Sequence, residues 1–188
     1  AKGVHGLILC HANSPQAVKE FVEQCRFRFR KKIGKNILSD GKRGHGGQVL
    51  ASKIWKINEQ EYLEKADPWP LNPNGELILG IKLENNIAIK NCSKSLKIPG
   101  IAFGDYGLGD ISFSQGYRSP VRFPLPNKII LIRDKVWKAC RRNKKYFWAQ
   151  VTKETIKEMI DEGLMFIRVY SKSIAIIGRK YTKRKKNW

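Results

Sequence analysis

Two acidic side chains stand where strand-like segments of this sequence end. Glu84 closes the run Gly-Ile-Lys-Leu-Glu, and Asp110 closes the glycine-rich run Gly-Asp-Tyr-Gly-Leu-Gly-Asp. In α/β proteins, ligand chemistry is usually found at the carboxyl ends of parallel strands. Carboxylate oxygens there suit a hard divalent cation. The sequence therefore predicts a magnesium- or manganese-type site at Glu84 and Asp110, against the alternative that both are ordinary carboxylates at a sheet edge.

The elements that must position these carboxylates alternate between strands and helices. Short apolar runs predict strands at 4–10, 76–83, 100–103, 146–151 and 164–169. Helical spacing and helix-start residues predict a helix from Pro15 to Cys25 with Asn13 or Ser14 as N-cap, a short helix within 54–66, and helices at 87–96, 128–144, 152–162 and 173–181. The first helix should bury Ala17, Val18, Phe21, Val22 and Cys25. Segment 26–48 should be a loop and the proline-rich segment 67–75 an irregular turn. This order predicts a parallel sheet in an α/β fold of about five β/α units.

Length and composition are those of a folded globule. The chain has 188 residues, of which 41% are hydrophobic and 10% aromatic, so a single domain over 1–188 with a basic tail at 179–188 is the simplest division. No apolar run approaches the ~20 residues that span a bilayer, and no secretory signal pattern opens the sequence. We therefore expect no membrane partner. The four cysteines have no CxxC spacing and are expected to be free thiols, which favours a reducing, cytoplasmic location.

The net charge of +21 is unusual and has two explanations. Basic residues cluster at 26–35, 141–145 and 179–188, and in the first cluster arginines alternate with phenylalanines, as in segments that contact nucleic acid. The abundance of Lys, Ile and Asn is equally typical of an AT-rich genome, which would place charge on any solvated surface. A nucleic-acid partner is thus one alternative and drift in base composition is the other.

Longer motifs carry a family resemblance that covers nearly the whole chain. They are Leu9-Cys-His-Ala, Gly41-Lys-Arg-Gly-His-Gly-Gly, Glu61-Tyr-Leu-Glu-Lys-Ala-Asp-Pro-Trp-Pro-Leu-Asn-Pro-Asn-Gly-Glu-Leu, Ile81-Lys-Leu-Glu, Pro99-Gly-Ile-Ala-Phe-Gly-Asp-Tyr-Gly-Leu-Gly-Asp, Met159-Ile-Asp-Glu-Gly and Ile177-Gly-Arg-Lys-Tyr. In this order they resemble the C-terminal part of the HpcH/HpaI aldolase family. That family folds as a (β/α)8 TIM-type barrel, so the resemblance implies an incomplete barrel here, without strands one to three.

The resemblance also implies an activity and a site. The family consists of metal-dependent carbon–carbon lyases that cleave 4-hydroxy-2-oxoacids to pyruvate and an aldehyde. Glu84 and Asp110 would hold Mg²⁺ or Mn²⁺, and the turn of Gly107, Leu108 and Gly109 would bind the 2-oxoacid, with Leu108 replacing the family's proline. The family also forms homo-oligomers.

One part of the family site has no counterpart among these residues. The family's catalytic histidine and arginine lie upstream of the segment that matches 4–10, and neither His11 nor His45 matches that histidine. We therefore expect aldolase activity if the missing N-terminal part is supplied. The alternative is a catalytically inactive, strongly basic relative that acts in a nucleic-acid or ribonucleoprotein assembly.

Overall fold

A computed structural model describes residues 2–29, 31–33, 36–38, 41–168 and 171–183 of the chain. The strands are β1 (Gly6–Leu9), β2 (Lys31–Ile33), β3 (Asn36–Leu38), β4 (Pro68–Trp69), β5 (Leu77–Lys82), β6 (Phe103–Asp105), β7 (Tyr146–Gln150) and β8 (Phe166–Arg168). The helices are α1 (Pro15–Cys25), α2 (Gln48–Trp55), α3 (Glu59–Lys65), α4 (Asn86–Leu96), α5 (Leu108–Ser114), α6 (Asn127–Arg142), α7 (Ile156–Asp161) and α8 (Lys172–Tyr181).

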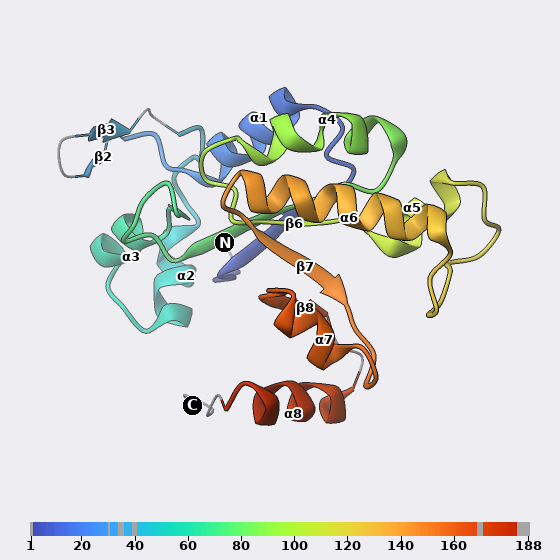
Figure 1. Cartoon of the computed structure of the whole chain (residues 1–188). Helices are drawn as coiled ribbons and strands as arrows, with labels where there is room; N and C mark the ends of the chain where they lie inside the picture. The colour runs from blue at the N-terminus through green and yellow to red at the C-terminus, as the bar shows by residue number, and fades with distance from the viewer. Residues whose placement is uncertain (1, 30, 34–35, 39–40, 169–170, 184–188) are drawn as a thin grey trace.

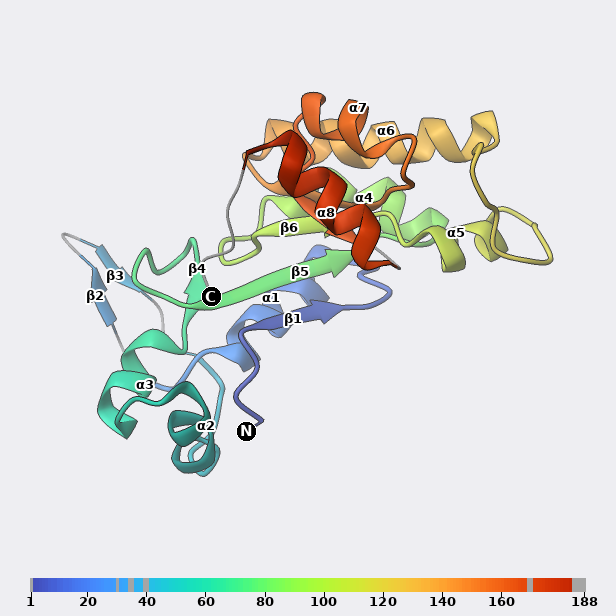
Figure 2. The same ribbon diagram turned by 90° about the horizontal axis from the view of Figure 1, so that it is seen from below.

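A curled, parallel sheet forms the centre of the molecule (Figure 1). Its strands run in the order β1-β5-β6-β7-β8, and every neighbouring pair is parallel. Figure 2 shows β1 and β5 side by side with their carboxyl ends at the same edge. This half-barrel confirms the predicted α/β class and the parallel sheet. Among the described residues no strand pairs with the outer edge of β1 or of β8.

Helices α1, α4 and α6 pack side by side along one face of the sheet (Figure 1). Each buries an apolar stripe, as the 3.6-residue spacing of the sequence predicts. In α1, Ser14 caps the first turn by accepting the Ala17 N–H at 3.1 Å, and Val18 and Val22 are buried. Ala17 itself is exposed, so its predicted burial is wrong: it lies in the first turn, on the solvent side of the stripe.

The opposite, concave face of the sheet carries a cluster of aromatic rings. Tyr146 stacks on Trp69 with ring centroids 5.9 Å apart, and Phe103 stacks on Phe166 at 5.0 Å. The side chains of β7 alternate between the two faces of the sheet. Phe147 therefore points to the helices, where it stacks on Trp137. The half-barrel is therefore lined on its inside by stacked side chains.

Several predicted elements differ from the structure. The expected loop 26–48 contains the antiparallel pair β2–β3, and the expected turn 67–75 contains β4, which pairs with the start of β5. Segment 54–66 holds the expected short helix as α3, which Asn58 caps, whereas helix α2 was not expected and ends at Trp55 because Lys56 adopts a left-handed conformation.

Two helix boundaries also differ from the predictions. The expected helix 152–162 begins only at Ile156, after a turn in which Thr152 and Thr155 hydrogen-bond to each other. Helix α8 includes the first residues of the expected basic tail, whereas 184–188 lie outside the described residues.

Two further observations concern membrane spans and cysteines in the described residues. No helix there is long and apolar enough to cross a membrane. All four cysteines are free: Cys25, Cys92 and Cys140 are buried and Cys10 is exposed.

Candidate active site

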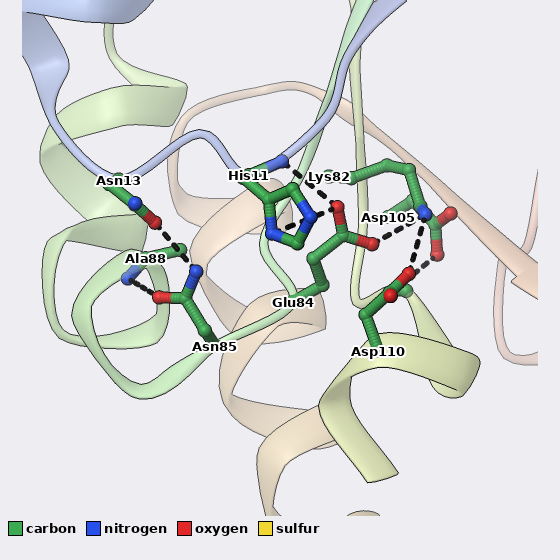
Figure 3. Close-up of polar contacts among 9 residues, drawn as sticks. His11, Asn13, Lys82, Glu84, Asn85, Ala88, Asp105 and Asp110 are labelled. Carbon is green, nitrogen blue, oxygen red and sulfur yellow. Dashed lines mark hydrogen bonds and ion pairs between the residues drawn. The ribbon is translucent and has the colours of Figure 1, made fainter. Parts of the chain in front are cut away.

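Glu84 and Asp110 lie together at the carboxyl edge of the sheet, with Lys82 between them (Figure 3). Lys82 is the last residue of β5, and its ammonium forms ion pairs with Glu84 Oε2 and, at 3.3 Å, with Asp110 Oδ2. The structure thus brings together the two carboxylates that the sequence singled out. It also adds a cation between them, which the sequence analysis did not consider.

Local structure fixes the position of Glu84. The chain leaves β5 after Lys82, and Asn85 caps α4 by accepting the Ala88 N–H at 2.9 Å. Asn85 also donates to Asn13 Oδ1 at 2.7 Å, which ties the start of α4 to the segment after β1 (Figure 3). Glu84 is therefore held between a strand end and a capped helix, and its side chain is fully buried.

His11 approaches Glu84 from the end of β1. Its backbone N–H donates to Glu84 Oε1 at 2.9 Å, and its ring Nδ1 lies 3.7 Å from the same oxygen. The His11 backbone has a φ of +48°, a left-handed conformation that is uncommon for residues other than glycine. The sequence analysis did not match His11 to the family's histidine position, but the structure places it at the site.

The site electrostatics keep Lys82 and Asp110 charged. Burial lowers the pKa of Lys82, but the ion pairs with Glu84 and Asp110 outweigh this effect, so the pKa is raised overall. Burial likewise opposes ionisation of Asp110, yet hydrogen bonding with Glu84 and Lys82 lowers its pKa below the usual value. Near neutral pH the centre of the site is an ammonium against a carboxylate.

Asp105 is a further acidic residue that the sequence analysis missed. It ends β6, is 7% exposed, and accepts the Gly107 N–H at 2.9 Å. Burial raises the pKa of Asp105 to about 6, although the Gly107 hydrogen bond and the Lys82 charge oppose the rise. Its place at the end of an apolar strand was a usable signal, since Glu84 was found in the same way.

Gly107 allows the turn after β6 to approach Glu84. Its φ is +53°, and a Cβ atom there would lie 2.4 Å from Glu84 Oε2 and 2.5 Å from Glu84 Cβ. Leu108 and Gly109 begin α5; the Leu108 side chain is buried, and Gly109 has open space around it. Assignment of these three residues to substrate binding stays a prediction.

An open cleft of about 1230 Å³ lies beside this cluster. Its charged lining residues are Lys82, Asp110, Arg122 and Arg168, so cations outnumber the acid. It is bounded by Gly107–Gly109 on one side and by the carboxyl ends of β7 and β8 on the other, with Gln150 and Arg168. A small anion is the ligand that this charge pattern favours.

The residues present do not fit a divalent cation between Glu84 and Asp110. Such a cation binds carboxylate oxygens at roughly 2.0–2.6 Å, which would place it where the Lys82 ammonium already contacts both side chains. Glu84 Oε1 already accepts a hydrogen bond from the His11 N–H. Within the described part of the chain, no group of three or more His, Cys, Asp or Glu side chains is arranged to hold a metal ion.

Solved structures with the same fold are found among HpcH/HpaI-type proteins. An HpcH/HpaI aldolase/citrate lyase family protein from Burkholderia cenocepacia matches 96% of this chain and 64% of its own length, with a TM-score of 0.69 and 16% identity. An HpcH/HpaI aldolase from Desulfitobacterium hafniense matches 96% and 62%, with a TM-score of 0.66 and 17% identity. Macrophomate synthase matches 96% and 58%, with a TM-score of 0.67 and 17% identity.

These likenesses concern the fold. The chain spans about three-fifths of the length of these solved structures. No family model matches the sequence, and no curated protein matches it. The chain therefore has the fold of part of an aldolase/citrate lyase-type protein, as the sequence motifs implied, and its activity has to be argued from the site.

Proposed function

We propose that this chain carries the substrate site of a carbon–carbon lyase that cleaves 4-hydroxy-2-oxoacids to pyruvate and an aldehyde. The observation that carries the proposal is the cation-lined cleft at the carboxyl ends of the parallel strands, in a half-barrel shared with aldolase/citrate lyase-type structures. We further propose that the chain is the C-terminal part of a (β/α)8 barrel.

The side chains of the cleft suit a 2-oxoacid. Such a molecule carries a carboxylate next to a carbonyl, and cleavage builds negative charge on that carbonyl oxygen. Arg122 and Arg168 offer cationic groups for the carboxylate, and the Lys82 ammonium offers a fixed positive charge for the developing enolate. The N–H groups of Leu108 and Gly109, which have no acceptor within α5, are the proposed further donors.

The proposed function includes neither a bound metal nor the groups that would transfer protons. Because Lys82 occupies the space between Glu84 and Asp110, the proposed function assigns no role to Mg²⁺ or Mn²⁺ at these carboxylates. The catalytic histidine and arginine implied by the resemblance are not assigned to residues of this chain. Homo-oligomer formation and a cytoplasmic location remain predictions. The alternative of a basic, nucleic-acid-associated protein has no support beyond the net charge of +21.

Calorimetric titration of the chain with oxalate, which mimics the pyruvate enolate, tests the proposal. Binding should be measurable, and Arg122→Met and Arg168→Met should each weaken it by about tenfold, the loss of one favourable charge interaction. Lys138→Met is the matched control, because Lys138 is an exposed cation on α6 that does not line the cleft.

The reaction itself is tested by release of pyruvate from a 4-hydroxy-2-oxoacid, detected with lactate dehydrogenase. If Lys138→Met weakens oxalate binding as much as Arg122→Met does, the loss is a general effect of charge. That result would refute the assignment of oxalate to this cleft. Absence of any oxalate binding by the folded chain would refute the proposed substrate class.

A further inference from the structure

We propose that the Lys82 ammonium is the built-in cation of this site, and that it excludes a divalent cation from the space between Glu84 and Asp110. This inference rests on the proposed function for its substrate, a 2-oxoacid, but not for its geometry. It disagrees with the metal-dependent chemistry that the family resemblance implies. The positive charge that a bound metal would present to the oxoacid is then part of the polypeptide.

The geometry places the ammonium at the point that a shared metal would need. Lys82 Nζ contacts Glu84 Oε2 and lies 3.3 Å from Asp110 Oδ2, so one cation joins a carboxylate of the β5–α4 connection to a carboxylate of α5 (Figure 3). Glu84 Oε2 is buried and accepts no hydrogen bond of normal geometry within the described residues. The Lys82 ammonium contacts this oxygen and must leave before a metal can bind there.

The backbone holds Lys82 in this position. Its carbonyl accepts the Ala12 N–H at 3.1 Å, and in the parallel register of β5 and β6 it is paired with Asp105. The Lys82 side chain is only 18% exposed. A lysine at a strand end, held on both sides by neighbouring strands, has less freedom to turn into solvent than a surface lysine.

Surface lysines of the same chain provide the contrast. Lys65 also joins two carboxylates, those of Glu61 at 3.1 Å and Glu76 at 3.0 Å, but its side chain is 38% exposed. Both of its partners are more than 40% exposed. Removal of Lys65 would leave two solvated carboxylates, whereas removal of Lys82 would leave a buried one beside a second carboxylate at the edge of a cleft.

Calorimetry with Mn²⁺ alone tests the inference without any substrate. The wild-type chain should bind Mn²⁺ at least tenfold more weakly than Lys82→Met, in which the two carboxylates face an empty space. Lys82→Arg should behave like the wild type, because it keeps a cation. Lys65→Met is the matched control and should not gain affinity. Adding Asp110→Asn to Lys82→Met should abolish the gain.

Circular dichroism would verify that each variant is folded, and Lys82→Gln replaces Lys82→Met if the latter is not. Equal Mn²⁺ affinity in the wild type and the folded Lys82 variant would overturn the inference, since the ammonium would then move aside freely. It would also be overturned if neither chain binds Mn²⁺, because the space would then not be a cation site.

A second titration separates this inference from the proposed function. With a chelator present, the wild type should bind oxalate unchanged, and Lys82→Met should bind oxalate only when Mn²⁺ is supplied. Oxalate binding by the wild type that requires Mn²⁺ would contradict the built-in cation. If no chain binds oxalate, the proposed 2-oxoacid function fails, while the Mn²⁺ comparison still decides the role of Lys82.

Discussion

The molecule contains two charged clusters that differ in how their buried carboxylate is satisfied. In the first, Arg26 Nε donates to Asp67 Oδ1 at 2.8 Å and Asn72 Nδ2 donates to Oδ2 at 3.1 Å, and all three residues are at most 3% exposed. In the second, Glu84 is equally buried, but its Oε2 has no well-directed hydrogen bond among the described residues and faces Lys82 at an open cleft.

The contrast separates a structural cluster from a candidate active site. Each oxygen of Asp67 has a directed donor, so the Arg26 cluster fixes the proline-rich segment that follows Asp67 against the end of α1. The backbone around it is equally tight: a Cβ atom on Gly75 would lie 2.2 Å from the Asp67 carbonyl oxygen. Glu84, in contrast, pairs with Lys82, which lines an open cleft that a ligand can enter.

The largest expected effect is loss of stability in Asp67→Ala. The change breaks the buried ion pair between Asp67 and Arg26, and breaking such a pair costs about 3–5 kcal/mol. Urea denaturation measures this loss. Lys65→Met, two residues away in sequence, removes exposed ion pairs and should change stability by about 1 kcal/mol or less. Similar losses in both variants would contradict the structural role of the buried Arg26–Asp67 pair.

Much of the fold could be predicted from the sequence because its signals are local. Ser14 before Pro15 marks the start of α1, and the continuous apolar run 77–81 is what a strand buried on both faces requires. Helix α2 was missed, and its end at Trp55 depends on Lys56 adopting a left-handed conformation, which lysine does not favour on its own. Strand β4 was missed because its pairing with β5 is a tertiary contact.

The site was predictable only where position along a strand reveals it. Glu84 and Asp110 follow strand ends, and the structure brings them together. The intervening cation was not predicted, since alternation along a strand does not tell whether Lys82 turns to the cleft or to solvent. The contact of His11 with Glu84 depends on the parallel pairing of β1 with β5, which joins residues 73 positions apart.

The next largest effect is a pH-dependent change in stability that Asp105→Asn should remove. Burial raises the pKa of Asp105 to about 6 from a usual value of 3.8, so in the folded chain ionisation is disfavoured. Protonated Asp105 therefore adds to the free energy of unfolding, and this contribution is fully present below about pH 4. It is lost as the pH rises through about 6, and it amounts to at most ~3 kcal/mol for a shift of two pKa units.

Asp105→Asn keeps an oxygen for the Gly107 N–H but cannot ionise, so it should be more stable than the wild type above pH 6 and similar to it below pH 4. Chemical denaturation at a series of pH values measures this. Asp134→Asn is the control, because Asp134 pairs with Arg133 at the surface of α6. A parallel pH profile in Asp105→Asn and the wild type would exclude Asp105 as the cause.

The smallest expected effect is a difference in stability between alanine variants of two glycines in the same turn. Gly107→Ala places a Cβ atom 2.5 Å from Glu84 Cβ at a φ of +53°, so it should cost about 2 kcal/mol for the left-handed backbone and displace Glu84 from Lys82. Gly109→Ala meets nothing within 4 Å in the first turn of α5 and should be neutral or stabilising by up to ~1 kcal/mol. Urea denaturation measures both changes.

If Glu84 is held in place by this close approach of the backbone, Gly107→Ala should also weaken oxalate binding while Gly109→Ala stays folded and stable. Equal stability of the two variants would instead mean that the turn relaxes around the added methyl group, and that Glu84 is positioned by the β5–α4 connection alone.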